Sequence, residues 1–115
     1  MSSEIKITVG ESANGLKGFV EAWHRAEAGD FRTERVLAFE SWEALASVLT
    51  TERYRMLRHL HDHPATSINA LAGQLGRQYR RVHEDVRILE RAGLLDVSKG
   101  SVKATADKLT AEIAL

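Results

Sequence analysis

Arginine is concentrated in a short polar stretch beyond the middle of the chain. Arg77, Arg80 and Arg81 fall within five residues, together with Gln78 and Tyr79. Arginine can form two hydrogen bonds to O6 and N7 of guanine, and glutamine can do the same to N6 and N7 of adenine. Tyrosine can contact a phosphate or stack on a sugar. The pattern therefore predicts a segment that reads the edges of base pairs in duplex DNA.

The residues before this stretch predict the first half of a helix-turn-helix. Ser67 is a candidate N-cap, because its hydroxyl can accept a hydrogen bond from a free amide of a helix over 68–75. Gly76 follows directly and can adopt the left-handed backbone that a tight turn between helices requires. A second helix is then expected over 78–91, ended by Gly93.

The second helix is amphipathic and is the segment expected to enter the major groove. Its inward positions recur at helical spacing and are Val82, Val86 and Leu89. With these residues buried, residues 77–81 stay at the leading end, where helix-turn-helix proteins contact base edges. Glu84 and Asp85 lie one turn later and oppose indiscriminate binding to phosphate. Asp85 is predicted to pair with a nearby arginine rather than to contact a base.

A hairpin is predicted after the second helix. Residues 94–98 and 102–104 have the composition of strands, and Lys99–Gly100 between them is a two-residue turn signal. Lys99 and Lys103 can touch phosphate and orient a DNA reader without specifying sequence. Two lysines on a hairpin are equally explained as a soluble sheet edge, so this contact stays open. The complete set of expected DNA contacts is Ser67, Arg77, Gln78, Tyr79, Arg80, Arg81, Arg87, Lys99 and Lys103.

The charge of the chain is divided between its halves. The 115 residues include 16 Lys/Arg and 16 Asp/Glu, so the net charge is zero. Residues 1–50 hold 5 basic and 8 acidic residues, a balance of −3, whereas residues 51–115 hold 11 and 8, a balance of +3. The basic half contains the helix-turn-helix pattern, as expected of a DNA reader whose other half dimerises or binds a partner. Because the excess is small, DNA affinity must depend on where the charges lie.

Two short strands and a helix are expected before the helix-turn-helix. Residues 4–9 alternate between apolar and polar, residues 12–28 place apolar side chains at helical spacing, and residues 35–39 form a second strand. The expected fold class is α+β. It consists of a winged helix-turn-helix domain over 41–115, preceded by a strand-helix-strand element over 1–40 that packs or dimerises.

Several further elements follow from apolar spacing. A helix is expected over 51–61, capped by Thr50. Its buried stripe is predicted to be Tyr54, Leu57 and Leu60. Trp23 and Trp42 lie on apolar helical stripes and are expected to be core or dimer-interface anchors. Residues 108–115 fit a helix or a strand, and their alternation favours a strand.

Catalysis and metal binding find little support in the residue pattern. The chain has no cysteine, which excludes disulfides, thiolate catalysis and zinc–thiolate sites. His59 and His63 share a helix face, but cations near a helix C-terminus explain them better than a metal site does. His83-Glu84 resembles the opening of a metalloprotease motif, yet Arg87 stands where the second histidine belongs. We expect no enzyme activity, no cofactor and no bound metal.

Two stretches of the chain resemble a prokaryotic family of predicted winged-helix transcriptional regulators. The resemblance covers 36–95 and rests on AFESWEALASVLTTERYRMLRHL and LAGQLGRQYRRVHEDVRILERAGLL. Its motifs are a strand ending in Phe-Glu-Ser, a Leu-Thr-x-x-Arg helix start and an Asp-Val-x-x-Leu core in the second helix. Residues 51–104 are also similar to winged helices of the multiple-antibiotic-resistance regulator type. The chain departs from the family at Ala104-Thr105-Ala106-Asp107, where Pro-Tyr-Asp is usual.

The resemblance implies a repressor, and members of that family often stand beside small toxin genes. It therefore implies an antitoxin that represses its own operon. Together with the residue pattern, it leads us to expect a cytoplasmic, sequence-specific regulator that binds double-stranded DNA as a homodimer on two half-sites. No secretion signal or membrane-spanning run is expected. The alternative is a protein-interaction module that neutralises a small toxin and binds little DNA, because winged helices also serve as protein-contact domains.

Overall fold

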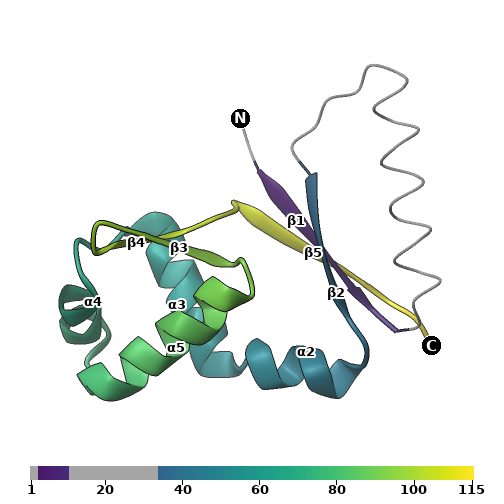
Figure 1. The fold of residues 1–115 in the computed structure, drawn as a ribbon, viewed down its shortest axis with the longest axis horizontal. Coiled ribbons are helices and arrows are strands. Elements are labelled where there is room, and N and C mark those ends of the chain that lie inside the picture. Colours follow the sequence, from purple (N-terminus) through teal and green to yellow (C-terminus); the bar gives the residue numbers. More distant parts are fainter. Residues whose placement is uncertain (1–2, 11–33) are drawn as a thin grey trace. The chain divides into compact units, whose positions relative to one another are not determined.

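The computed structural model describes residues 3–10 and 34–115 and shows an α+β protein (Figure 1). The helix expected over 12–28, which includes Trp23, lies outside the described residues. Contacts divide the chain into two compact units. The first comprises residues 1–46 and 108–115, and the second comprises residues 47–107. In the described part of the chain, no helix is long and apolar enough to cross a membrane.

The first unit contains a three-stranded parallel sheet with the order β2-β1-β5. Its strands are β1 (Glu4–Val9), β2 (Glu34–Phe39) and β5 (Lys108–Ile113). The alternation predicted for the first strand is confirmed, because Ile5, Ile7 and Val9 are all buried. On the other face of the sheet, Lys6 Nζ lies 3.0 Å from Glu112 Oε2 and ties β1 to β5.

The last strand pairs with the first strand of the chain. The preference for a strand over a helix at 108–115 is confirmed, since β5 pairs with β1 from Glu4↔Lys108 to Val9↔Ile113. The sequence-based division grouped this segment with the helices of 41–115, whereas its backbone hydrogen bonds lie in the sheet of the first unit. Alternation identifies a strand but carries no information on which partner it pairs with.

A short helix, α2 (Trp42–Val48), follows β2. The Ser41 hydroxyl accepts a hydrogen bond from the amide of Ala44 at 3.1 Å and so caps the helix. Leu45 is buried, but Trp42 is 56% exposed. Trp42 is therefore not a core residue of this chain, and its role as a dimer-interface anchor stays a prediction.

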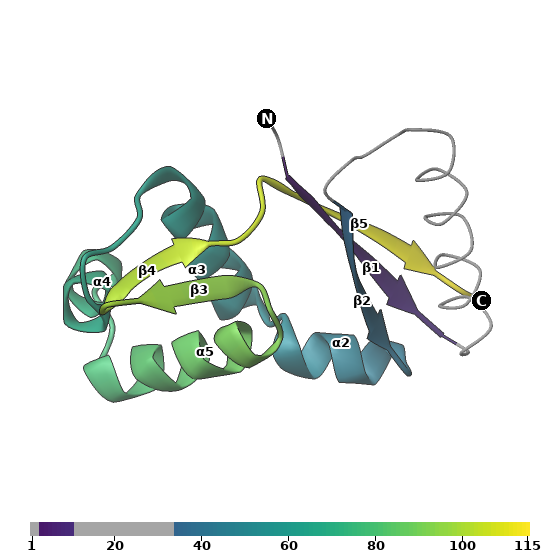
Figure 2. The same cartoon turned by 45° about the horizontal axis from the view of Figure 1, so that its top comes forward.

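The second unit consists of three helices and a hairpin, drawn from teal to yellow-green in Figure 2. Its elements are α3 (Thr51–Asp62), α4 (Ile68–Leu75), α5 (Tyr79–Arg91), β3 (Leu95–Ser98) and β4 (Ser101–Ala104). The caps that the sequence predicts are present. Thr50 Oγ1 accepts from the amide of Arg53 at 3.3 Å, and Ser67 Oγ accepts from the amide of Ala70 at 2.9 Å. Gly76 adopts the left-handed conformation, with φ of 65°, and turns the chain into α5.

The core of the second unit is built from one face of each helix and the hairpin. The predicted inward residues of α5 are confirmed, because Val82, Val86 and Leu89 are all 0% exposed. The stripe predicted for α3 is wrong at Tyr54, which is 46% exposed. Its buried residues are Met56, Leu57 and Leu60. Met56 is buried in place of Tyr54 because the buried face is rotated around α3 relative to the predicted stripe. At about 100° per residue it centres on Met56, Leu57 and Leu60, and Tyr54 lies well to one side of it.

The hairpin lies beside α5 and closes the unit (Figure 2). Strands β3 and β4 pair antiparallel, and the two turn residues Lys99 and Gly100 both have positive φ, at 53° and 84°. This is the backbone that a two-residue hairpin with the twist of its strands requires. Ala65, between α3 and α4, exchanges two backbone hydrogen bonds with Val102, at 2.9 and 2.8 Å. The hairpin is thereby joined to the segment that leads into α4.

Candidate nucleic-acid interface

Helix α5 presents a polar outer face opposite its buried residues. Successive outward positions at helical spacing are Arg80, Glu84, Arg87 and Arg91, and Arg81 lies on the flank. Gln78 precedes the helix and is exposed, and its side chain makes no capping hydrogen bond. Residues 78–81 therefore stand together at the leading end of α5, as the sequence predicts.

Arg80 and Arg81 are exposed and free of ion pairs within residues 3–10 and 34–115. Arg87 differs, because its Nη1 lies 2.9 Å from Glu90 Oε1 one turn later. An exposed arginine that holds no carboxylate keeps all five of its N–H donors for a ligand. The leading end of α5 thus has two uncompensated guanidinium groups, whereas the middle of the helix is locally neutralised.

Tyr79 begins α5 and is 50% exposed. Its ring lies 5.7 Å from the ring of His83, one turn later, with the planes tilted by 44°. Half of the residue is therefore exposed while its ring contacts a neighbour on the same helix. A tyrosine in this position can donate a hydrogen bond to a phosphate oxygen beside the two arginines.

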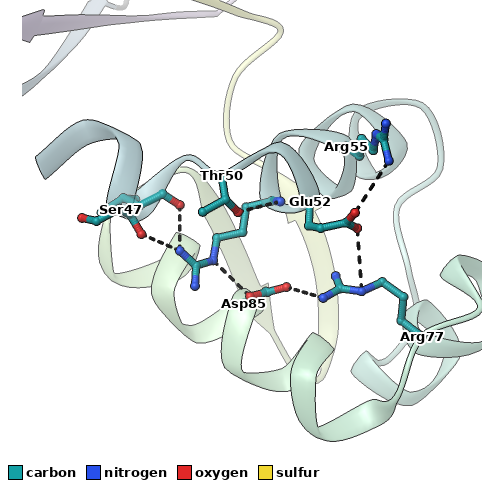
Figure 3. A network of polar contacts seen from close by, with 8 residues as sticks. Ser47, Thr50, Glu52, Arg55, Arg77 and Asp85 are labelled. Atoms are coloured by element: carbon teal, nitrogen blue, oxygen red, sulfur yellow. Dashed lines mark hydrogen bonds and ion pairs between the residues drawn. The ribbon is translucent and has the colours of Figure 1, made fainter. Parts of the chain in front are cut away.

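Arg77 is oriented toward two carboxylates, and Figure 3 shows its guanidinium group between Glu52 and Asp85. Arg77 lies in the turn, two residues before the first residue of α5, and its side chain is only 23% exposed. Its Nη2 lies 2.9 Å from Asp85 Oδ2, and its Nε lies 3.9 Å from Glu52 Oε2. Nη1 is buried and has no hydrogen-bond partner among the described residues. The guanidinium group is directed into the unit, and so Arg77 does not join the exposed group of residues 78–81.

The predicted arginine partner of Asp85 is confirmed, and there are two such partners. Asp85 is a buried residue of α5, and its Oδ1 accepts a hydrogen bond from Nε of Arg53 at 3.0 Å. Arg53 also donates from Nη1 to the backbone carbonyls of Ser47 and Val48, at 2.7 and 3.1 Å. Each carboxylate oxygen therefore faces a different arginine, one from α3 and one from the turn (Figure 3).

Arg53 was missed as a site residue because 32 residues separate it from Asp85. The signal available in the sequence was that Arg53 ends the Leu-Thr-x-x-Arg motif and Asp85 begins the Asp-Val-x-x-Leu motif. A buried carboxylate requires a partner, and an arginine in a second motif was a candidate. The structure joins the two motifs through this one ion pair.

The remaining expected contacts lie on other elements of the second unit. The hydroxyl of Ser67 caps α4, and its side chain is half-buried. Lys99 and Lys103 are exposed on the hairpin, with Lys99 at the turn itself. Lys99 holds a left-handed backbone that a residue with a Cβ adopts only at a cost of about 1 kcal/mol.

Three histidines near the end of α3 contact neighbouring side chains. His59 Nε2 lies 2.7 Å from Gln74 Oε1, and its ring lies 5.3 Å from the ring of His63. His61 lies 3.0 Å from an oxygen of Asp62 and 3.0 Å from an oxygen of Asp107. No group of three or more ligands that could hold a metal ion occurs in the part of the chain that the structure describes.

Residues 48–111 match the HVO_A0114 family, and the chain belongs to that family. The matched region begins just before α3 and extends into β5, so it includes every element that carries an expected contact. No curated protein and no solved structure matches the chain. The function is therefore argued from the geometry of this region.

Proposed function

We propose that the chain is a winged helix-turn-helix regulator that binds double-stranded DNA through the leading end of α5. The observation that carries the proposal is the contrast between its arginines. Arg53 and Arg77 hold a buried carboxylate, whereas Arg80 and Arg81 are exposed without an ion pair in residues 34–115. The two uncompensated cations stand at the end of the helix that follows a left-handed glycine turn.

The placement of these groups matches what base reading requires. A helix that enters the major groove contacts base edges through side chains of its first turns. Gln78, Arg80 and Arg81 supply the side-chain types that bond to adenine and guanine there. Glu84 stands on the outer face one turn after Arg80 and repels phosphate. This arrangement favours one docking direction and disfavours general coating of DNA.

The hairpin is the proposed wing. Lys99 at its tip and Lys103 on β4 are both exposed and can contact phosphates flanking the groove that α5 occupies. A positive φ at Lys99 supports this role, since Asn or Gly would hold the same turn with less strain. The wing contributes affinity, and α5 contributes sequence preference.

A single α5 covers only part of a binding site, so we propose that the regulator acts as a homodimer on two half-sites about one helical turn apart. Repression follows from occupying promoter DNA. On this proposal the chain is a DNA-binding protein without enzymatic activity, and it acts where the DNA is, in the cytoplasm of a prokaryotic cell.

The proposal is tested by measuring fluorescence anisotropy of labelled duplex DNA, first with a random 30-base-pair pool (a length of about three helical turns) and then with sequences selected from it. We expect selection of a two-fold symmetric sequence. We also expect binding to weaken steeply with salt, since each neutralised phosphate contributes a slope of about −0.9 in log K against log salt. Binding that is absent at low salt, or insensitive to salt, would contradict the proposal.

A matched pair of variants tests the site. Arg80→Ala with Arg81→Ala removes two charges at the leading end of α5. Arg91→Ala with Arg58→Ala removes two exposed charges away from that end, one at the last residue of α5 and one on α3. We expect the first pair to abolish selection of a specific sequence and the second pair to retain it. If the protein instead purifies with a small protein at fixed stoichiometry and retains no DNA, it is the protein-interaction module that the sequence left as the alternative.

A further inference from the structure

We infer that Arg77 is a positioning residue that keeps Asp85 from capturing Arg81. This inference rests on the proposed function, in which Arg81 contacts DNA. It concerns a residue that the sequence pattern groups with the DNA contacts and that the structure turns away from them.

Arg81 and Asp85 are four residues apart on α5, and helical geometry places side chains at that spacing on one face. An arginine and a carboxylate so related form an ion pair readily when neither has another partner. Among the described residues Arg81 forms no ion pair with Asp85, whose carboxylate instead faces two other arginines. Oδ1 accepts a hydrogen bond from Arg53 Nε at 3.0 Å, whereas Oδ2 faces Arg77 Nη2 across an ion pair at 2.9 Å and accepts no hydrogen bond among the described residues.

The two arginines that hold Asp85 differ in what else they do. Arg53 also donates hydrogen bonds to the backbone carbonyls of Ser47 and Val48, and these contacts do not involve the turn that contains Arg77. Among residues 3–10 and 34–115, the second carboxylate near Arg77 is the more distant Glu52, at 3.9 Å. Replacing Arg77 is thus expected to free Oδ2 of Asp85 while the contacts of Arg53 with Asp85, Ser47 and Val48 remain.

The position of Arg77 explains how it reaches Oδ2. Gly76 turns the chain back with φ of 65°, and the amide of Arg77 donates to the carbonyl of Ala72 at 3.1 Å. These contacts hold the backbone of Arg77 against the end of α4, and its side chain crosses to the second turn of α5. Because its guanidinium group is directed inward, Arg77 acts on DNA binding through Asp85 and Arg81.

The inference predicts that one substitution lowers the specific affinity for DNA and that a second substitution restores it. In Arg77→Gln, Oδ2 of Asp85 is released, and Arg81 pairs with it and is withdrawn from the base edge. Specific affinity is then expected to fall about ten- to a hundred-fold, the same loss as for Arg81→Ala. Adding Asp85→Asn removes the charge that captures Arg81. The double variant is therefore expected to recover specific affinity to within about threefold of Asp85→Asn alone.

The experiment measures binding of the selected duplex across a salt series for the unchanged protein, Arg77→Gln, Asp85→Asn and the double variant. The inference is supported if the double variant recovers specific affinity and if Arg77→Gln has the same salt slope as the unchanged protein. A loss that Asp85→Asn does not rescue, accompanied by a slope reduced by about one phosphate contact, overturns it and makes Arg77 a phosphate ligand.

A measurement without DNA separates this inference from the proposed function. The side-chain Nε–H resonance of Arg81 in an NMR spectrum reports its ionic partner directly. We expect Arg77→Gln to shift this resonance and Arg91→Gln to leave it in place, with all other amide signals of the core preserved. If the protein binds no DNA but the shift is seen, the proposed function fails and the capture of Arg81 stands. If no shift is seen, the inference fails whether or not DNA binds.

Discussion

Arg53 and Asp85 form a direct hydrogen-bonded ion pair, 3.0 Å long, between the first turn of α3 and the second turn of α5. Both side chains are little exposed, at 13% and 12%. The pair fixes the helix that carries the candidate DNA contacts to the helix that begins the second unit. The orientation of α5, including its exposed leading end, thus depends on a contact that involves none of residues 78–81.

Asp85→Ala is expected to destabilise the protein by about 3 kcal/mol, because Arg53 and Arg77 are both little exposed. The substitution leaves Arg53 without its carboxylate and Arg77 with only the more distant Glu52, at 3.9 Å, among the described residues. The measurement is chemical denaturation monitored by circular dichroism. Glu84→Ala is the matched control, since Glu84 is the exposed carboxylate next in sequence and should change stability by less than about 0.5 kcal/mol. Equal effects of the two substitutions would show that the network contributes nothing.

Arg81→Ala is expected to lower affinity for a selected duplex by about 1–3 kcal/mol and to relax the preferred sequence. The physical reason is the loss of a two-bond contact to a guanine edge by an exposed, unpaired guanidinium group. Parallel titrations with selected and random duplexes measure the difference. An equal loss on both would make Arg81 a phosphate contact.

Gly76→Ala is expected to destabilise the protein by about 1 kcal/mol, because Gly76 has φ of 65° and an alanine there is strained. No heavy atom lies within 4 Å of the added Cβ, so the cost is one of backbone conformation alone. Gly73→Ala is the control, since Gly73 lies inside α4 and its Cβ also meets nothing within 4 Å. There we expect a gain of about 0.5–1 kcal/mol from helix propensity. Thermal unfolding of the two variants should therefore shift in opposite directions.

Lys99→Asn is expected to raise stability by about 0.5–1 kcal/mol and to lower DNA affinity. Asparagine tolerates the positive φ of this turn position better than lysine, and Asn-Gly is the preferred pair for such a hairpin. The affinity loss reflects one fewer cation on the proposed wing. Denaturation tests the change in stability, and anisotropy on the same preparation tests the change in DNA affinity. A loss of stability would show that the backbone at Lys99 is not strained.

The stability of the protein is expected to depend on the protonation of His61. Hydrogen bonds to Asp62 and then to Asp107 raise the pKa of His61 above its ordinary value of 6.5. A raised native pKa means that the folded state binds the proton more tightly than the unfolded chain does. This contribution is fully present below about pH 6.5 and is lost as the pH rises through the native pKa.

The measurement compares the unfolding midpoints of the unchanged protein and of His61→Gln at about pH 5.5 and about pH 8.5. The difference between the two proteins should be larger at the lower pH. The same comparison in an Asp107→Asn background should give a smaller effect of His61→Gln at the lower pH. The reason is that Asp107→Asn removes one of the two carboxylates that face the imidazole. A difference that is the same at both pH values would show that the contacts of His61 do not favour its charged form.

The helices and turns of the second unit could be predicted because they depend on neighbours in the sequence. Ser67 caps α4 through an amide three residues away, Gly76 turns the chain by its own backbone freedom, and the spacing of Val82, Val86 and Leu89 defines the buried side of α5. Each of these effects acts within one or two helical turns, so a short window of sequence contains its cause.

The pairing partners could not be predicted, because they depend on how distant segments come together. The alternation of β5 predicted a strand, but its place beside β1 is set by backbone hydrogen bonds across more than 100 residues. The arginines between 77 and 81 looked equivalent in sequence, yet Arg77 faces a buried carboxylate and Arg81 faces solvent. Residue type and spacing were sufficient to place the arginines near the turn. The folded position of Asp85, which is held by Arg53 from another helix, decided that Arg77 forms a structural ion pair and that Arg80 and Arg81 stay exposed.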